Sequence, residues 1–384
     1  MPEAPEPIVR EARFDDFEAV RSLRLRFGLG DDSPQDWRAL WLENPALAGT
    51  THLPIGWVLE AERRIVGFVG SIPTQVAFGE QSLLAVSAHA MVIEREYRRG
   101  YRLSLNAPLF SLEGVDLVLN TSANYGSGRI VQAFGAVPVP SPDYDRSLFW
   151  VLRPGAFLRA YLRRRVTCRL LAAALGWCGA GLLAADRIAR RRRPIRPSGA
   201  ADLSICEIDQ IGEEFDGLWA RKTRESARLL GVRTGEALRW HFRQSPGAKR
   251  ARAVCCRRAG RLAGYAIIMQ LDAPELGLGR IRIADLLAED DDPGVIDDLL
   301  WAAYQQARRD RVSVLELVGF PRTIRARLAR RNPYLRQLVS WPYFYRASGT
   351  ELQAALGSEQ AWYACPYDGD DTILAALGSQ APAP

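Results

Sequence analysis

The chain has 384 residues, a mass of 42.7 kDa and a composition that is 48% hydrophobic and 25% charged. These values are typical of a folded protein with about two domains, and they exclude a disordered, collagen-like or coiled-coil chain. The six cysteines show no C-x-x-C spacing, which excludes a disulfide scaffold and predicts no metal site. The acidic, proline-rich N-terminus lacks the pattern of a secretory signal. We therefore expect reduced cysteines and a cytoplasmic location.

The positive charge is concentrated in one segment. The net charge is +7, yet residues 159–196 alone hold eleven arginines and one acid, Asp186, so the rest of the chain is slightly acidic. Because nucleic-acid-binding proteins spread their cations over a face or groove, no DNA partner is expected. Residues 170–185 are apolar or glycine, but this stretch is too short and too positively flanked for a transmembrane helix. It fits either a peripheral helix on an anionic membrane surface, at the inner face of the membrane, or a helix packed against the domains.

The first half of the chain predicts a mixed sheet with helices on its faces. A short strand at 8–13 is followed by an amphipathic helix from Phe17 and by a helix that contains Trp37, after the cap signal Ser33-Pro34. Three strands then end at glycine, proline or charged residues, as in an antiparallel meander: 56–61, 65–78 and 82–93. A helix after Gly100, a strand at 115–119 and a short helix toward Phe134 complete a β-α-β unit. This order predicts an α/β fold, with a mixed, mostly antiparallel sheet flanked by helices.

The second half repeats this pattern. Aligning Gly67 with Gly264 matches the surrounding segments 56–69 and 253–266, and it brings three further pairs of apolar strands into register: 87–93 with 281–287, 115–119 with 312–317, and 147–150 with 342–345. The sequence therefore predicts a duplicated domain of about 150 residues per copy. The expected boundaries are a first domain at 1–155, a basic amphipathic helical linker at 156–199, a second domain at 200–350 and a tail at 351–384.

Residues 91–103 carry the first motif of the first copy. The run Glu94-Arg-Glu-Tyr97-Arg98-Arg99-Gly100-Tyr101-Arg102 resembles the V-x-P-x-Y-R-G-x-G pattern of GCN5-related N-acetyltransferases (GNAT), with Tyr101 and Arg102 in the loop and the second glycine absent. The resemblance implies tandem GNAT-like domains that bind acetyl-CoA or another acyl-CoA. It implies that the pyrophosphate is held at Arg98, Arg99, Gly100 and Tyr101. The backbone N–H groups of Val92 and Ile93 would hold the thioester carbonyl.

Residues 120–136 carry the second motif. Asn124 opens the predicted helix and Gly135 closes it, as in the same family, which implies that Asn124 contacts the pantetheine arm or the departing thiol; a helix cap is the alternative role. Family members often place a general-acid tyrosine where this chain has Val131, which leaves Tyr125 or Tyr144 as candidates for protonating the thiolate.

A general base is also expected on the strand at 82–93. His89 is the leading candidate, because Ala85, Ser87, His89 and Met91 share one face of a regular strand. Glu94 is the second candidate. A structural histidine that only makes a hydrogen bond is the alternative for His89.

The second copy is expected to be degenerate. Its equivalent segment, 288–293, reads Ala-Glu-Asp-Asp-Asp-Pro and would repel a pyrophosphate. One active and one inactive GNAT copy in tandem resemble FemAB-like and polysaccharide-pathway acyltransferases. The segment 362–371 joins aromatic residues to carboxylates, and it would either close over a sugar or amine acceptor or form a solvated turn anchored by Trp362.

These observations predict an acyl-CoA-dependent acyltransferase, of acetyl type, that acts on an amine or hydroxyl of a small molecule or saccharide precursor. Two alternatives stay open. The first is a non-catalytic GNAT-fold binding or scaffold protein. The second is a FemAB-like transferase that uses aminoacyl-tRNA, in which the basic segment 159–196 would contact RNA.

Overall fold

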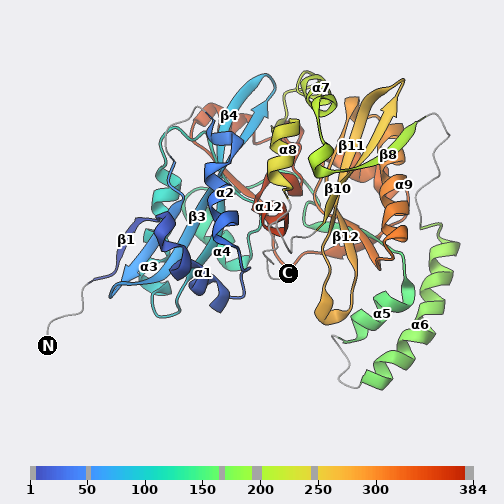
Figure 1. The fold of residues 1–384 in the computed structure, drawn as a ribbon, viewed down its shortest axis with the longest axis horizontal. Helices are drawn as coiled ribbons and strands as arrows, with labels where there is room; N and C mark the ends of the chain where they lie inside the picture. Colours follow the sequence, from blue (N-terminus) through green and yellow to red (C-terminus); the bar gives the residue numbers. More distant parts are fainter. Residues whose placement is uncertain (1–5, 49–52, 164–168, 193–200, 244–249, 377–384) are drawn as a thin grey trace. The chain divides into compact units, whose positions relative to one another are not determined.

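The computed structural model describes residues 6–48, 53–163, 169–192, 201–243 and 250–376. They belong to two compact units (Figure 1). Unit 1 consists of Met1–Pro140, Ser226–Ala248 and Val339–Pro384, and unit 2 consists of Ser141–Glu225 and Lys249–Leu338. Each unit contains a mixed sheet and helices, so the predicted α/β class is confirmed.

Unit 1 contains most of the first half of the chain and two returning segments. Its strands are β1 (Ile8–Glu11), β2 (Gly56–Ala61), β3 (Arg64–Phe78), β4 (Gln81–Ile93), β5 (Leu117–Asn120), β6 (Val137–Pro138), β9 (Leu229–Gly231) and β15 (Phe344–Ala347). Its α-helices are α1 (Phe17–Arg26), α2 (Pro34–Leu42), α3 (Arg98–Asn106), α4 (Tyr125–Ala133), α8 (Gly235–His241), α11 (Thr350–Ala355) and α12 (Asp370–Ala376).

Unit 2 is built in the same way. Its strands are β7 (Arg146–Val151), β8 (Asp202–Glu207), β10 (Ala251–Arg258), β11 (Arg261–Gln270), β12 (Arg280–Ala288), β13 (Val314–Leu317) and β14 (Tyr334–Gln337). Its α-helices are α5 (Pro154–Arg163), α6 (Arg169–Ala189), α7 (Glu213–Lys222), α9 (Pro293–Arg309) and α10 (Arg322–Ala329).

The two sheets have the same sequence of strand directions. The orders are β1-β2-β3-β4-β5-β15-β6 and β8-β10-β11-β12-β13-β7-β14. In both, the first four strands are antiparallel, the fifth is parallel to the fourth, and the last two are again antiparallel. This agreement fits the predicted tandem arrangement.

The sixth strand of each sheet comes from the other half of the chain. β15 pairs with β5 in unit 1, and β7 pairs with β13 in unit 2. The units therefore differ from the contiguous domains 1–155 and 200–350 expected from the sequence. The expected linker at 156–199 lies in unit 2, and the expected tail at 351–384 lies in unit 1. The local pattern identifies a strand, but it does not determine which sheet the strand joins.

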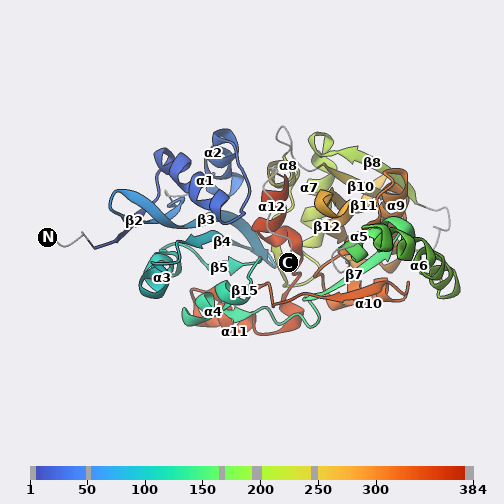
Figure 2. The same ribbon diagram turned by 90° about the horizontal axis from the view of Figure 1, so that it is seen from below.

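Helices cover both faces of the unit 1 sheet, which positions its core in two layers. Figure 2 shows α1 and α2 on one face and α3 and α4 on the other. The first layer contains aromatic residues such as Trp37, Trp41 and Phe68. The second contains Val86, Leu105 and Phe110. The cap predicted at Ser33 is present, because its hydroxyl accepts a hydrogen bond from the Asp36 N–H at 3.0 Å and Pro34 begins α2.

The apolar stretch 170–185 lies within α6, which packs beside α5 in unit 2 (Figure 1). Of the helices in the described ranges, none is both long and apolar enough to cross a membrane. Side chains of α6 are described from Gly179 onward, and there Leu182 and Ile188 are 75% and 74% exposed. Contact of 159–196 with a membrane surface stays a prediction.

Candidate active site

The sheet of unit 1 opens between its two parallel strands. β4 and β5 pair from Ala85–Leu117 to Ser87–Leu119, and β4 then continues to Ile93 without β5 as its partner. We call this opening the β4–β5 fork. The carboxyl ends of both strands lie there, and α3 and α4 begin shortly after them. Crevices of this kind, at the carboxyl ends of parallel strands, are the usual ligand sites of α/β sheets.

A bulge in β4 shapes one side of the fork. Gly70 pairs with His89 and Phe68 pairs with Val92, so β4 has one residue more than β3 in this stretch. Ala90 takes up the extra residue with a φ of 49°. The predicted shared face of Ser87, His89 and Met91 is therefore wrong at Met91, which packs against the α3 and α4 side of the sheet.

The bulge also sets the direction of the backbone donors. The Glu94 N–H donates to the Val66 carbonyl on β3 at 2.8 Å. Because backbone groups alternate in direction along an antiparallel strand, the Val92 N–H points toward β3 and the Ile93 N–H points away from it, toward the fork. Of the two predicted thioester-binding donors, the register thus directs Ile93 to the fork.

The turn into α3 is held by protein contacts, but its first helical turn is open. Arg98 Nε donates to the Ile93 carbonyl at 3.0 Å, and its guanidinium lies 5.3 Å from the centre of the Phe27 ring. Arg99 and Gly100 are exposed, and a Cβ on Gly100 would meet no atom within 4 Å. No side chain caps this helix, whose N-cap residue is Tyr97. Its first N–H groups have no acceptor within the helix, which favours an anionic ligand there.

Tyr101 stands where the GNAT pattern has its second glycine. Its ring lies 6.4 Å from that of Tyr97 and packs against the core layer of α3 and α4. The bulky residue therefore packs into the protein and leaves the turn before it uncovered.

The start of α4 forms the other side of the fork. The Asn124 side chain caps this helix by accepting hydrogen bonds from the N–H groups of Gly126 and Ser127 at 2.9 and 3.0 Å. Tyr125 is 74% exposed, and the Arg129 guanidinium lies 5.9 Å from its ring centre. Asn120, at the end of β5, is buried, and its Oδ1 has no hydrogen-bond partner. Asn124 thus has the capping role that the sequence left as its alternative.

His89 lies next to a carboxylate from the C-terminal segment. The ring is 2% exposed and meets Phe68 edge-on, with 6.5 Å between ring centres. Its Nδ1 is 3.7 Å from Asp370 Oδ2 and has no hydrogen-bond partner. Asp370 Oδ1 accepts hydrogen bonds from Ser122 Oγ at 2.9 Å and Thr121 Oγ1 at 3.2 Å. Asp370 was missed as a partner of His89, because no local pattern links residues so far apart in the chain.

The segment 361–370 is buried throughout. Tyr363 and Cys365 are fully buried, and the Cys365 N–H donates to Asp368 Oδ2 at 2.7 Å. The interpretation of 362–371 as a solvated turn is therefore wrong, because its aromatic residues contribute to the core of unit 1.

Glu94, the second candidate base, is held by two arginines. Its carboxylate lies 2.5 Å from Arg26 Nη2 and 3.6 Å from Arg64 Nη2, and its side chain is 14% exposed. These ion pairs hold the end of β4 against Arg26 and Arg64.

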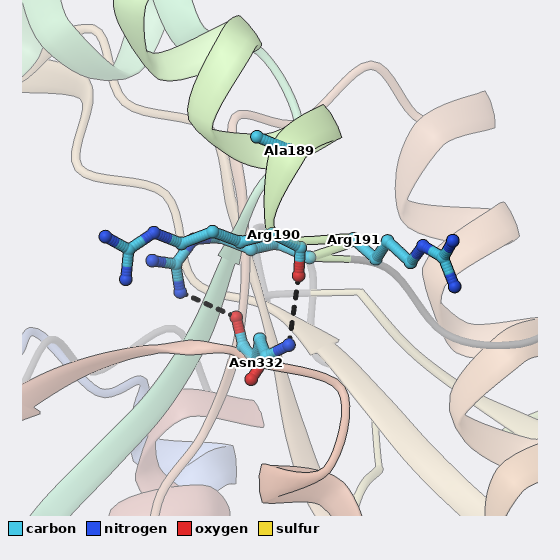
Figure 3. A pocket seen from close by; sticks show the side chains of 5 residues that line it. Ala189, Arg190, Arg191 and Asn332 are labelled. Carbon is cyan, nitrogen blue, oxygen red and sulfur yellow. Dashed lines mark hydrogen bonds between the residues drawn. The ribbon is translucent and has the colours of Figure 1, made fainter.

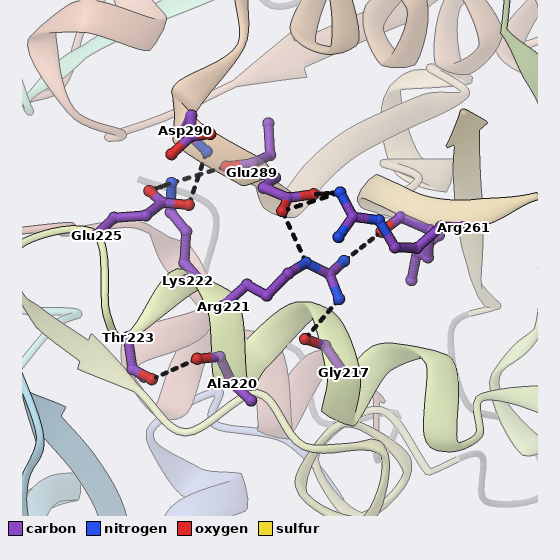
Figure 4. A network of polar contacts seen from close by, with 11 residues as sticks. Gly217, Ala220, Arg221, Lys222, Thr223, Glu225, Arg261, Glu289 and Asp290 are labelled. Carbon is purple, nitrogen blue, oxygen red and sulfur yellow. Dashed lines mark hydrogen bonds and ion pairs between the residues drawn. The ribbon is translucent and has the colours of Figure 1, made fainter. Parts of the chain in front are cut away.

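The equivalent position in unit 2 holds several of the chain's own carboxylates. Figure 4 shows two of them, Glu225 and Glu289, bound to Lys222 and to Arg221 and Arg261. β12 leads through Glu289–Asp291 into α9, as β4 leads into α3. Asp292 Oδ1 accepts hydrogen bonds from the N–H groups of Gly294 and Val295 at 2.7 and 2.9 Å, so the start of α9 is capped. Buried Lys222 donates to Glu225 and Asp291, both at 2.6 Å. The site for an external anion is thus occupied by side chains.

A separate hollow of about 400 Å³ in unit 2 is lined by Ala189, Arg190, Arg191, Arg192 and Asn332. Figure 3 shows Arg190 and Arg191 extending in opposite directions. The Arg192 guanidinium donates hydrogen bonds to Asp186 Oδ2 at 2.7 Å and to the Asn332 carbonyl at 2.8 Å. These cations do not converge on one point, so we do not assign the hollow as a catalytic site. In the described part of the chain, no group of three or more His, Cys, Asp or Glu residues could hold a metal ion.

The fold is similar to three solved structures of acyl-transferring or related proteins. A GCN5-related N-acetyltransferase from Anabaena variabilis has a TM-score of 0.58 and 11% identity, over 90% of this chain and 73% of that chain. A conserved protein of unknown function from Enterococcus faecalis, described as a probable N-acyltransferase, has a TM-score of 0.56 and 10% identity, over 89% and 72%. The Saccharomyces cerevisiae N-myristoyltransferase with bound myristoyl-CoA has a TM-score of 0.53 and 12% identity, over 90% and 81%.

These similarities show that the chain has the fold of the GCN5-related N-acetyltransferase superfamily, which confirms the predicted fold. The sequence matches no protein-family model and no curated protein. The FemAB-like form stays a prediction.

Proposed function

We propose that the protein is an acyl-CoA-dependent acyltransferase whose cofactor site is the β4–β5 fork of unit 1. The acceptor would be an amine or hydroxyl of a small molecule or saccharide precursor, and the acyl group would be acetyl. The observation that carries the proposal is the contrast between two helix starts. The first turn of α3 is uncapped by any side chain and flanked by exposed Arg99, whereas the first turn of α9 is capped by Asp292.

The residues of the fork fit an acyl-CoA. The pyrophosphate would lie on the N–H groups of the first turn of α3, near Arg99 and Gly100, and the Ile93 N–H would polarise the thioester carbonyl. Asn124 would act by fixing the start of α4 beside the acyl-CoA. Exposed Tyr125 is the candidate for protonating the departing thiolate. His89 would take the proton from the acceptor as its nitrogen or oxygen attacks.

Calorimetry of acetyl-CoA binding tests the proposal with a matched pair of variants. Gly100→Glu adds a carboxylate to the first turn of α3, where the surrounding space is open. Ser104→Glu adds the same charge at an exposed position one turn later. We expect the wild type and Ser104→Glu to bind alike, and Gly100→Glu to bind at least about tenfold more weakly, because its charge lies beside the pyrophosphate.

A carboxylate in the first turn of a helix does not destabilise it, and a substitution at exposed Ser104 should change the free energy of unfolding by well under about 1 kcal/mol. Both variants should therefore fold, which circular dichroism checks. Absence of binding by the folded wild type would contradict the proposal and favour the scaffold or tRNA-dependent alternatives. Equal binding by the two variants would place the cofactor elsewhere.

A further inference from the structure

The C-terminal segment brings a buried carboxylate to the only histidine of β4. Asp370 is 2% exposed, and a carboxylate this deeply buried needs polar partners. Its Oδ1 has two hydroxyl donors, Ser122 and Thr121, and its Oδ2 faces His89 Nδ1 at 3.7 Å. We propose that Asp370 is a positioning residue that orients His89 as the general base of unit 1. This inference rests on the proposed acyltransferase function.

The carboxylate of Asp370 would determine which ring nitrogen of His89 carries the proton. An ionised carboxylate only accepts hydrogen bonds, so the imidazole nitrogen that faces it is the one that carries a proton. A proton on Nδ1 leaves Nε2 with its lone pair, ready to accept a proton from an acceptor. The separation of 3.7 Å is longer than a hydrogen bond, and such contacts commonly shorten when substrate is bound.

The surroundings of His89 leave polar atoms without partners. His89 Nδ1 and Ser87 Oγ are both buried without a hydrogen bond, two residues apart on β4 and before the bulge at Ala90. Buried polar atoms without partners are costly, and a catalytic role is one of the reasons for which proteins retain them. The ring of His89 also depends on the glycine opposite it, because a Cβ on Gly70 would lie only 2.9 Å from His89 Cδ2.

The position of Asp370 is fixed by contacts that do not involve His89. Gly369 packs directly against Thr121, where a Cβ would overlap the threonine side chain. Asp368, two residues before Asp370, is held by buried Arg233, whose guanidinium lies 3.4 Å away. Arg233 also donates a hydrogen bond to the Gly231 carbonyl at 2.7 Å. Asp370 is thus carried to His89 by the fold of the segment, so replacing its carboxylate should leave that fold in place.

The reaction step that His89 and Asp370 would support is the transfer of the acyl group from the thioester to the acceptor. A bond forms between the acceptor nitrogen or oxygen and the acyl carbon, the thioester C–S bond breaks, and the sulfur leaves with the electron pair. The acceptor's proton moves to His89 Nε2, and the Asp370 carboxyl group stays beside the imidazolium that results, without taking up the proton itself. The thiolate would take its proton from Tyr125, the candidate acid, and His89 Nε2 would release its proton to solvent, from which Tyr125 regains one.

Nuclear magnetic resonance of the histidine rings tests the pair without any acyl-CoA. The chain has three histidines, so ¹⁵N-histidine labelling gives three sets of ring signals, and His89→Gln identifies those of His89. We expect wild-type His89 to carry its proton on Nδ1, and Asp370→Asn to shift it to Nε2 or to a mixture. Asp371→Asn, which removes the neighbouring carboxylate, serves as the control and should leave the tautomer unchanged. An Nδ1 proton retained in Asp370→Asn would overturn the proposal.

Release of free thiol from acetyl-CoA with a panel of primary amines gives a second readout. Asp370→Asn should lower kcat on the order of 10²-fold while leaving the KM for acetyl-CoA unchanged, because the carboxylate does not touch the cofactor. An unchanged kcat, or a change confined to KM, would show that Asp370 is only structural. The two experiments separate the proposals: if the tautomer shifts as expected but the wild type does not bind acetyl-CoA, the pair exists and the acyltransferase function fails.

Discussion

Tyr345 of β15 pairs with Leu119 of β5, although the two residues lie in opposite halves of the chain. In return, Phe149 of the first half pairs with Glu316 of β13. Each sheet therefore depends on a strand supplied by the other half, and neither half contains all the residues of one compact unit.

This exchange predicts that the fragment 1–155 does not fold as the whole chain does. Without β15, the buried strand β5 becomes an unpaired edge, and the fragment also lacks β9, α8 and α12. We expect no cooperative thermal transition by circular dichroism and a tendency to aggregate. A sharp, reversible transition of the isolated fragment would show that the exchange is not needed for folding.

The position of Gly70 next to His89 leaves no room for a larger side chain, so substitution there should destabilise the fold. Gly70→Ala places a Cβ 2.9 Å from His89 Cδ2 and 3.1 Å from Phe68 Cζ, so the His89 ring must move. Overpacking of this kind costs about 1–3 kcal/mol in the free energy of unfolding, which urea titration measures. Gly100→Ala is the control, because its Cβ meets open space and alanine favours a helix. Equal stability of Gly70→Ala and the wild type would contradict the account.

The cap formed by Asp292 should stabilise the fold through its side-chain oxygen, so variants with and without that oxygen should differ in their free energy of unfolding. Burial raises the pKa of this carboxyl, but the Val295 and Gly294 N–H groups and Arg258 lower it by more, so the net shift is downward. Asp292→Ala removes the cap and should cost about 1 kcal/mol by urea unfolding at neutral pH, whereas Asp292→Asn keeps a capping oxygen and should lose less. If alanine and asparagine cost the same, the oxygen is not acting as a cap.

The buried carboxylate of Glu316 should make the free energy of unfolding depend on pH. Its buried carboxylate lies 2.9 Å from Arg282 and 3.6 Å from Arg280. Burial raises its pKa, and the arginines lower it by more, so the folded value lies below the ordinary 4.5. The ionised group therefore stabilises the fold above about pH 4.5, and this stabilisation is lost as the pH falls through the folded pKa.

Urea unfolding of the wild type and Glu316→Gln from pH 7 to pH 3 measures this effect. The variant leaves two partly buried arginines without the carboxylate that pairs with them, so it should cost about 3 kcal/mol at pH 7. The difference between the two proteins should shrink at acid pH. A difference that stays constant across this range would mean that Glu316 is not held in its charged form by the arginines.

Much of the local structure could be predicted from the sequence. The strand expected at 56–61 is β2, the strands expected at 65–78 and 82–93 differ from β3 and β4 by one residue at the start, and Ser33 and Asn124 cap helices. These features depend on neighbouring residues, through period-two burial and the hydrogen bonds of a single turn.

The details of the site could not be predicted in the same way. The bulge in β4 uses Ala90 where a glycine would have marked a positive φ, so no residue type signalled it. The pairing of β15 with β5 and the approach of Asp370 to His89 depend on contacts between distant segments. A local pattern shows that a segment is a strand or a turn, but the partner is decided by the packing of the whole unit.

We propose that the helix start of α3 binds acyl-CoA and that the equivalent helix start of α9 does not. Hydrogen–deuterium exchange of the full chain with and without acetyl-CoA tests it directly. We expect slower exchange in peptides that cover 93–103 and 120–128 of unit 1, no change at 288–296 of unit 2, and loss of the protection in Gly100→Glu. Protection at 288–296, or none at 93–103 under saturating acetyl-CoA, would contradict the account.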